Sequence, residues 1–358
     1  MISYIYFIKI QHKSQHASII NALLKNILIK TIILIGFFAD LSYNVFINIH
    51  KEKIVKKVAL VIDNSTYLSQ EDLAIVKPVK VLPISFIVNG DEYYENVNMT
   101  YEQFFEYLKD KNTDVSTSQP SIEAVKEEWR NILTEYDEIV YMILSSGLSE
   151  ACNAAINASH QEEFEGRVFV PNNQRVSILN KSQLIQARYL IDQGKSGVEI
   201  KEYLESTKGE CGVYLAVDTL RYLKKGGRVT PAAAAIGTLL NIKPILQIHG
   251  GKLDAYAKVM SMRQAKQKMI NATKKEIEER FPEEAKQGKV HICMAHTFVD
   301  LDAQELKDFE ADVRAAFPDY PFFTHDPLPL FIVCHTGPGV MAVAYVVDRI
   351  DAINSLQK

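Results

Sequence analysis

The sequence predicts an α/β protein of two domains, a parallel-sheet α/β domain followed by an α+β domain. Three observations predict this class. From residue 57 onward, short apolar runs alternate with amphipathic stretches, which is typical of a parallel sheet with helices on both faces. The length of 358 residues is sufficient for two domains. Hydrophobic residues make up 47% and charged residues 23%, as in ordinary globular proteins.

The first domain is expected over residues 57–208. Residues 56–69 predict a buried strand that leads into a polar loop, and residues 80–95 predict a second strand with a turn at Asn89-Gly90. Apolar residues at helical spacing predict helices in the ranges 99–110, 121–136, 147–164 and 181–194. Further strands are expected at 137–146 and 166–173.

The second domain is expected over residues 209–358. Residues 212–229 predict a strand, a short helix and a Gly-Gly turn, and residues 230–248 predict an apolar helix that runs into a strand. A hairpin partner at 249–261 and a charged amphipathic helix at 262–281 follow. The remaining elements are expected at 289–298, at 302–317 as a helix, at 321–327, and at 330–347, where an apolar strand ends at His335.

The first 56 residues have a different composition from the rest. They are rich in Ile, Asn and Lys, and their longest uninterrupted apolar run, residues 32–39, is shorter than the roughly 20 residues of a membrane-spanning helix. The sequence "FFADLS" is a poor signal-peptide cleavage site. We expect a poorly ordered extension or sequence upstream of a misplaced start, and no stable membrane insertion.

Charge and cysteine content restrict the class of protein further. The net charge is −4 and the isoelectric point is about 6.2, which does not favour a nucleic-acid partner. Four cysteines, Cys152, Cys211, Cys293 and Cys334, occur without CxxC spacing. This pattern indicates reduced thiols in a cytoplasmic protein, with neither disulfides nor a zinc site.

Two segments rich in hydroxyl groups each precede a predicted helix. "DVSTSQPS", residues 114–121, contains Thr117 and Ser118, and "LSSGLSEA", residues 144–151, contains Ser146 and Ser149. Free backbone N–H groups at helix N-termini, together with several hydroxyls, form a natural anion site. Each residue alone is also explained as a helix cap or turn residue. Because both clusters are expected at strand ends, the sequence favours a binding role.

Two further motifs carry candidate functional residues. "HTGPG", residues 335–339, places His335 beside a Gly-rich loop, where backbone can approach a ligand closely. "KKGGRV", residues 224–229, fits neither GxxxxGK[ST] nor GxGxxG, so no nucleotide site is expected there. Lys224, Lys225 and Arg228 could form a docking surface for a partner or a solvated turn.

An alternative function is a serine hydrolase. "GLSEA" differs from the GxSxG nucleophile elbow only at its last residue, so Ser149 could be a nucleophile with His335 as its base. The reaction would still need an acidic residue to orient the histidine, and the sequence does not identify one.

Six ordered motifs carry a resemblance to a known family. "VALVIDNSTYLS", "VSTSQPS", "LSSGLS", "VDTLRYLKKGGRV", "GTLLNIKPILQIHGGKL" and "CHTGPG" resemble the DegV family of bacterial fatty-acid-binding proteins, over roughly residues 57–350. The resemblance implies a long-chain fatty acid between two domains, with Thr117 and Ser149 on its carboxylate and His335 in the same polar network. It also implies a separate ATP-dependent fatty acid kinase that phosphorylates the bound acid for phospholipid synthesis.

The sequence departs from the family pattern at three places. Glu150-Ala151 replaces Gly-Thr, "PNNQRVS" at 171–177 replaces an Asp-Ser pair, and Arg263 lacks its following glycine. A carboxylate at Glu150 would repel an anionic ligand unless it points away.

The sequence therefore predicts a non-enzymatic lipid carrier without a cofactor, which presents a fatty acid to a kinase. The hydrolase and a binder of some other small anion remain as alternatives. Ser118 and Ser146 are expected to assist at the head group, and the apolar stretches "PISFIV" and "PAAAAIGTLL" are candidate walls for the lipid tail.

Overall fold

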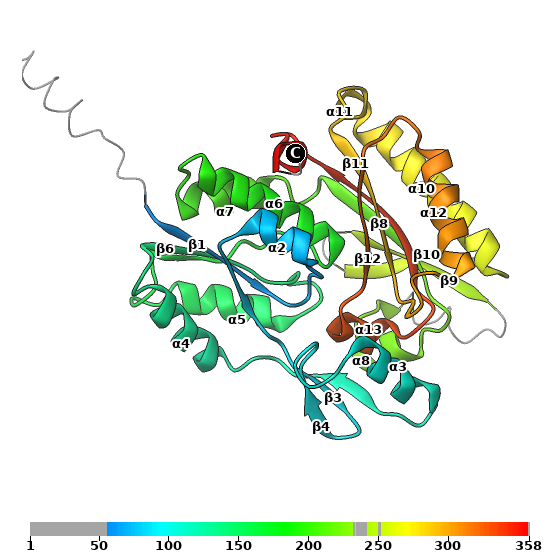
Figure 1. Cartoon of the computed structure of the whole chain (residues 1–358), viewed down its shortest axis with the longest axis horizontal. Helices are drawn as coiled ribbons and strands as arrows, with labels where there is room; N and C mark the ends of the chain where they lie inside the picture. The colour runs from blue at the N-terminus through cyan, green and yellow to red at the C-terminus, as the bar shows by residue number, and fades with distance from the viewer. Residues whose placement is uncertain (1–55, 232, 234–241, 250–251, 357–358) are drawn as a thin grey trace, which may run out of the picture. The chain divides into compact units, whose positions relative to one another are not determined.

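The computed structural model describes residues 56–231, 233, 242–249 and 252–356, and residues 56–358 form one compact unit. The predicted extension, apart from Lys56, lies outside the described residues, as does most of the apolar helix expected within 230–248. The predicted mixed α/β class is confirmed (Figure 1). The expected domain boundary at 208/209 stays a prediction.

The first sheet is parallel, with strands in the order β2-β1-β6-β7. Its strands are β1 (Val58–Asp63), β2 (Val79–Leu82), β6 (Glu138–Met142) and β7 (Val168–Phe169). All residues of β1 and β6 are buried because helices cover both faces of the sheet. This explains why these strands are apolar runs rather than alternating patterns.

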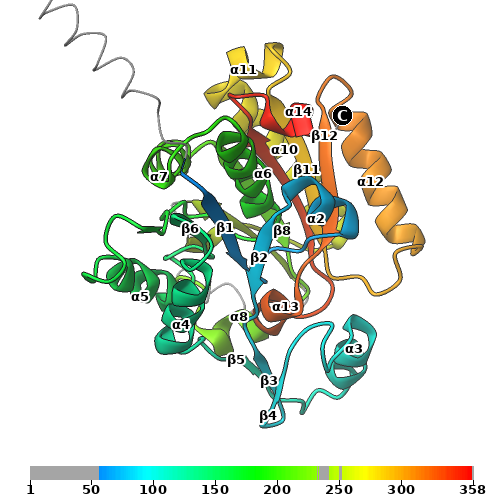
Figure 2. The ribbon, with the colours of Figure 1, turned by 60° about the vertical axis from the view of Figure 1, so that its left-hand side comes forward.

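The two faces of this sheet carry different helices. One face packs against α4 (Ile122–Ile132) and α5 (Glu150–Ser159), around Trp129. The other packs against α2 (Gln70–Val76), α6 (Ile178–Asp192) and α7 (Gly197–Ser206). Figure 2 shows α6 and α4 on opposite sides of β1. Helix α7 was not predicted from the sequence, although Ser196 and Glu199 form a capping box at its start.

The predicted strand within 80–95 is divided into three. After β2, Pro83 interrupts the ladder, and β3 (Phe86–Val88) forms a hairpin with β4 (Asp91–Tyr93). Asn89 and Gly90 have φ of 53° and 94°, as a two-residue hairpin turn requires. On its other side β3 pairs with β5 (Val115–Thr117), and α3 (Tyr101–Lys109) connects β4 to β5.

The second sheet has six strands in the order β10-β9-β8-β13-β11-β12, and only β11 and β12 are parallel. Its strands are β8 (Cys211–Ala216), β9 (Lys243–His249), β10 (Lys252–Val259), β11 (Val290–His296), β12 (Phe322–Pro327) and β13 (Met341–Val347). The predicted hairpin partner of β9 is confirmed as β10. One face packs against α10 (Met262–Arg280) and α12 (Gln304–Ala316). The short helices α8 (Arg221–Gly226), α11 (Pro282–Lys286) and α14 (Ala352–Leu356) lie between or after its strands.

One element was wrongly predicted. The apolar run that ends at His335 is helix α13 (Leu330–Thr336), not a strand, so His335 lies in the last turn of a helix. A short apolar run cannot be assigned to helix or strand from periodicity alone when most of it is buried. Pro329 precedes the helix, and Gly337, with φ of 74°, ends it.

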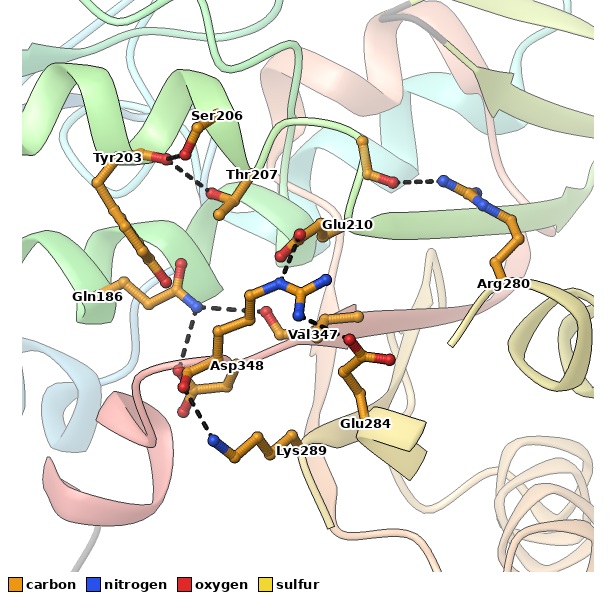
Figure 3. Close-up of polar contacts among 12 residues, drawn as sticks. Gln186, Tyr203, Ser206, Thr207, Glu210, Arg280, Glu284, Lys289, Val347 and Asp348 are labelled. Atoms are coloured by element: carbon orange, nitrogen blue, oxygen red, sulfur yellow. Dashed lines mark hydrogen bonds and ion pairs between the residues drawn. The ribbon is translucent and has the colours of Figure 1, made fainter. Parts of the chain in front are cut away.

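Helix α6 connects the two sheets. It packs against β1 on one side and against the inner face of β8, β11 and β13 on the other, so 12 of its 15 residues are buried. Its buried polar side chains have partners on both sides. Figure 3 shows Gln186 reaching the end of β13, where its Nε2 atom donates to Val347 O at 3.4 Å and to Asp348 Oδ1 at 3.2 Å.

Candidate functional site

A cavity lies between the start of α6 and the inner face of the second sheet. Its free space is about 940 Å³ when the open solvent at its mouth is included. Most of the wall is apolar and comes from distant parts of the chain: Leu144, Leu148, Val176, Ile178, Leu179, Val213, Leu215, Leu223, Ile248, Leu253, Ala295, Leu328, Phe331, Ile332, Val340 and Ala342. Because strand residues two apart share a face, Val213 and Leu215 of β8 line it together.

Thr117 and His335 meet on the cavity wall. Thr117 ends β5, and its Oγ1 atom lies 3.0 Å from Nε2 of His335. The His335 ring packs closely against Gly226, where a Cβ atom would collide with Nδ1. No described residue gives Nδ1 a hydrogen-bond partner. Lys225 fixes this arrangement from outside, since its Nζ atom donates to Val115 O at 3.1 Å and thereby holds α8 against β5.

Ser149 lines the same cavity from the first sheet. It is the N-cap of α5, and its Oγ atom accepts a hydrogen bond from Ala151 N at 3.2 Å. The side chain is only 8% exposed. Its hydroxyl hydrogen is not used by this cap, so it is available to a ligand oxygen at the positive end of the helix.

The other predicted hydroxyls differ in position. Ser118 lines the cavity, and its Oγ atom hydrogen-bonds to Oγ of Ser85. Ser146 is not among the lining residues, and its Oγ atom donates to Asn172 Oδ1 at 2.9 Å. The expectation that both hydroxyl segments follow strands of one parallel sheet was wrong. Thr117 belongs to the small antiparallel sheet, whereas Ser149 follows β6 of the parallel sheet.

Arg228, which the sequence suggested for partner docking, lies on the cavity wall. Its Nε atom donates to Leu148 O at 3.2 Å and its Nη1 atom to Gly226 O, which places the cation beside the residue before Ser149 and beside Gly226, against which His335 packs. Among the described residues it has no acidic partner. Lys224 and Lys225 are exposed outside the cavity, and Lys225 forms an ion pair with Asp114.

The electrostatic environment keeps His335 neutral. Burial, together with the nearby charge of Arg228, lowers the pKa of the His335 imidazole to about 4. At neutral pH the imidazole therefore carries one proton, and Arg228 is the cation of this group.

The geometry does not favour the serine hydrolase. The imidazole of His335 contacts Thr117 and not Ser149, and no described carboxylate reaches its Nδ1 atom. Ser149 Oγ is used as a helix cap. A nucleophile, its base and an orienting acid are therefore not assembled.

The departures at Glu150 and at 171–177 lie outside the polar group. Glu150 is exposed, and its Oε2 atom accepts from Nδ2 of Asn153 at 2.9 Å, so its charge faces away from the cavity. In the second segment Arg175 is fully buried and donates to Ser182 Oγ and to Thr207 O, at 3.0 and 2.7 Å. Only Val176 and Ser177 of this segment line the cavity.

Neither stretch proposed for the tail wall supplies it within the described residues. Ile84, Phe86 and Val88 of "PISFIV" are buried in the core instead. Residues 232 and 234–240 of "PAAAAIGTLL" lie outside the described residues. Arg228 and Ser177 line the cavity, although the sequence did not predict either of them there. One feature of the sequence could have indicated Ser177: it is a polar residue within the otherwise apolar run Val176–Leu179.

Within residues 56–231, 233, 242–249 and 252–356, no cluster of His, Cys, Asp and Glu could hold a metal ion. In the same part of the chain, no helix is long and apolar enough to cross a membrane. Cys152, Cys211, Cys293 and Cys334 are free.

Fold and cavity together define a class of protein: a mixed α/β protein with an apolar cavity between two sheets and polar side chains on its wall. Within this class, the chain belongs to the DegV family. The model of that family, described as "Uncharacterised protein, DegV family", matches residues 57–348.

The match to curated relatives extends over nearly their whole length. A DegV domain-containing protein of Deinococcus radiodurans is 28% identical over 289 residues, which are 80% of this chain and 97% of the relative. One from Staphylococcus aureus strain COL is 29% identical over 297 residues, with 82% and 99% covered.

Solved structures have the same fold. A structure of a DegV family protein from Thermus thermophilus, described as showing fatty acid binding, has a TM-score of 0.70 at 27% identity and covers 82% of this chain and 100% of its own. A stearic-acid-binding protein from Eubacterium ventriosum has a TM-score of 0.72 at 20% identity, with 83% and 99% covered, and supports the fold alone.

Proposed function

We propose that this protein binds a long-chain fatty acid, with the carboxylate held by the hydroxyls of Thr117 and Ser149 and the tail in the apolar cavity. The observation that carries the proposal is the grouping of Thr117, Ser149, His335 and Arg228 on one cavity whose remaining wall is largely apolar. The fatty acid binding described for the Thermus thermophilus relative supports the same ligand class.

The tail of a fatty acid needs apolar surroundings and its carboxylate needs hydrogen-bond donors. The wall of the cavity contains both kinds of side chain. Each buried CH₂ of the tail contributes about 0.8 kcal/mol, so a long chain gains roughly 10 kcal/mol before the cost of ordering it. A buried carboxylate without hydrogen bonds would be strongly unfavourable. Hydroxyl donors and a nearby cation remove that penalty.

The protonation of His335 sets the direction of the hydrogen bonds. With Nε2 protonated, His335 donates to Thr117 Oγ1, and the Thr117 hydroxyl hydrogen is then free to donate to the carboxylate. The Ser149 hydroxyl donates from the other side while its oxygen continues to cap α5. Arg228 supplies the positive charge.

The second part of the proposal concerns a partner. The protein is a carrier and not an enzyme: it presents the bound fatty acid to a separate ATP-dependent fatty acid kinase, which forms the acyl phosphate. Exposed Lys224 and Lys225, on the same short helix that packs against His335, are proposed docking residues with Arg228. Four free cysteines favour a reducing, cytoplasmic location.

The test is native mass spectrometry of the full chain, followed by denaturing extraction. The expected result is an added mass of a few hundred daltons that is released as free fatty acid. The double variant T117V/S149A should lose this mass while circular dichroism shows an intact fold. A chain that carries no lipid and does not bind added palmitate or oleate would contradict the proposal.

A further inference from the structure

Ser177 is a hydroxyl on the cavity wall that has no hydrogen-bond partner. It lies within the apolar segment Val176–Leu179, all of which lines the cavity. Its residue is 5% exposed, and no described residue accepts from or donates to its Oγ atom. A buried hydroxyl that makes no hydrogen bond is unfavourable by about 1–3 kcal/mol. Because Ser177 also lines the cavity, a ligand there could supply the missing partner.

The local backbone shows that this hydroxyl does not serve helix α6. Ser177 is the N-cap residue of α6, a position where serine normally accepts from a backbone N–H group of the first turn, but its side chain makes no capping bond. Its φ of 52° and ψ of −131° are unfavourable for a residue with a side chain. At this backbone conformation the hydroxyl does not cap the helix it precedes.

The other hydroxyls of the wall are all engaged with the protein. Thr117 contacts His335, Ser118 contacts Ser85, and Ser149 caps α5. Thr336 donates to the backbone of its own helix, at Ile332 O. Among the described lining residues, Ser177 is the one buried hydroxyl that has no hydrogen-bond partner in the protein.

We propose that Ser177 hydrogen-bonds an oxygen substituent on the acyl chain, so that the preferred ligands are hydroxylated fatty acids rather than plain ones. This inference rests on the proposed function and specifies its ligand class. A plain chain lying against Val176–Leu179 would leave the Ser177 hydroxyl without a partner. A chain with a hydroxyl at the matching carbon would satisfy it, since a hydroxyl both donates and accepts. The preference is therefore for one position of the hydroxyl along the chain.

The experiment compares ligands that differ only in this hydroxyl. The full chain, freed of lipid by extraction and refolding, is loaded with a fluorescent fatty acid, which is displaced by stearate or by 2-, 3-, 10- or 12-hydroxystearate. Wild-type protein should prefer at least one hydroxystearate over stearate by about fivefold, the effect of one added hydrogen bond.

Two variants remove the hydroxyl. In S177G the positive φ suits glycine, so the variant should fold at least as well as wild type; S177A removes the same atom without relieving the backbone. Both should bind hydroxystearate and stearate equally, within twofold. The matched control is S159A, which removes a buried serine hydroxyl that donates to Ile156 O at 2.8 Å, outside the cavity. It should keep the wild-type preference.

The outcomes separate this inference from the proposed function. Binding of stearate with no preference for any hydroxystearate would overturn the role of Ser177 and leave fatty acid binding intact. If S177G loses affinity for stearate and hydroxystearate equally, Ser177 acts on the carboxylate that both ligands share. This result would also overturn its proposed role at the acyl chain. A protein that binds none of these ligands would contradict the proposed function itself.

Discussion

The Oγ1 atom of Thr117 and the Nε2 atom of His335 lie 3.0 Å apart although 218 residues separate them in the chain. This contact joins the small antiparallel sheet to helix α13. It depends on Gly226, because the imidazole occupies the space that a side chain there would fill. The position of the Thr117 hydroxyl is therefore set by a residue that does not itself line the cavity.

The substitution G226A tests this packing. The added Cβ atom would collide with Nδ1 of His335, so the ring must move and its contact with Thr117 should be lost. Gly226 has no positive φ, and alanine favours the helix that it ends, so the fold should be kept. We expect palmitate affinity to fall about tenfold, consistent with one lost hydrogen bond to a charged group. Isothermal titration calorimetry measures the palmitate affinity of both proteins.

The control for this variant is G209A, whose Cβ atom would meet nothing closer than Arg280 Nη2 at 4.0 Å. It should bind palmitate as wild type does. Unchanged palmitate affinity in G226A would show that the orientation of His335 does not matter for binding.

A pair of substitutions at Ser149 separates its two roles. S149A removes the N-cap of α5 and the proposed carboxylate donor, so the free energy of unfolding should fall by about 1 kcal/mol and bound lipid should be lost. S149D keeps a capping oxygen, but its negative charge repels the carboxylate. We expect S149D to be more stable than S149A and equally free of lipid, as measured by urea unfolding and mass spectrometry. Retained lipid in S149D would remove Ser149 from the head-group site.

Acid should destabilise the lipid-free protein partly through His335. Burial lowers the pKa of this imidazole from 6.5 to about 4, so between these pH values the unfolded chain binds a proton that the folded chain does not. Its contribution to stability is thus present above pH 6.5 and is lost as the pH falls toward 4. H335Q should show a shallower fall in the free energy of unfolding across this window.

Urea unfolding at half-unit intervals of pH measures both slopes. His291 and His296 also have pKa values lowered by burial, that of His296 to about 3, so the slope should decrease in H335Q without vanishing. The exposed His160 provides the control H160Q. Equal slopes in wild type and H335Q would contradict the neutral, buried state of His335.

Lys181 of α6 is expected to be essential for stability. Its Nζ atom lies 2.6 Å from Asp72 Oδ2 and 2.8 Å from Asp326 Oδ2, and all three side chains are nearly buried. K181M would leave two buried carboxylates without a cation, which should lower the free energy of unfolding by about 3–5 kcal/mol. The exposed pair of Lys109 and Glu106 gives the control K109M, with an expected loss below about 1 kcal/mol. Chemical denaturation measures the free energy of unfolding of each variant. If K181M lowers it as little as K109M does, Lys181 does not have this stabilising role.

Much of the fold could be predicted from local sequence. The apolar run of β1, the Asn89-Gly90 turn and the spacing of α3 each have a local physical cause, and all three were predicted correctly. Helix α13 was mistaken for a strand because an apolar run buried on several sides has no period to distinguish the two. The division of residues 80–95 into three strands depends on tertiary pairing with β5, which lies more than 20 residues further along the chain.

The site was only partly predictable for a related reason. Thr117, Ser149 and His335 occur in polar motifs beside predicted helices, so the sequence singled them out. Arg228 looked like a surface cation because its bonds to Leu148 O and Gly226 O form only after folding. The hydroxyl of Ser177 lacks a hydrogen-bond partner in the folded protein. This cannot be predicted from the sequence, because it depends on which groups surround the hydroxyl after folding.

Helix α6 packs against both sheets, and this restricts how the protein can evolve. A substitution on its buried surface changes the packing of the parallel sheet or of the mixed sheet. Its polar residues bond to Thr66, in the loop after β1, and to Thr324 and Val347 of the mixed sheet. The two halves of the chain therefore cannot diverge independently or be exchanged with those of a relative as separate modules. Any recombination point between them must carry α6 together with the partners that it has on both sides.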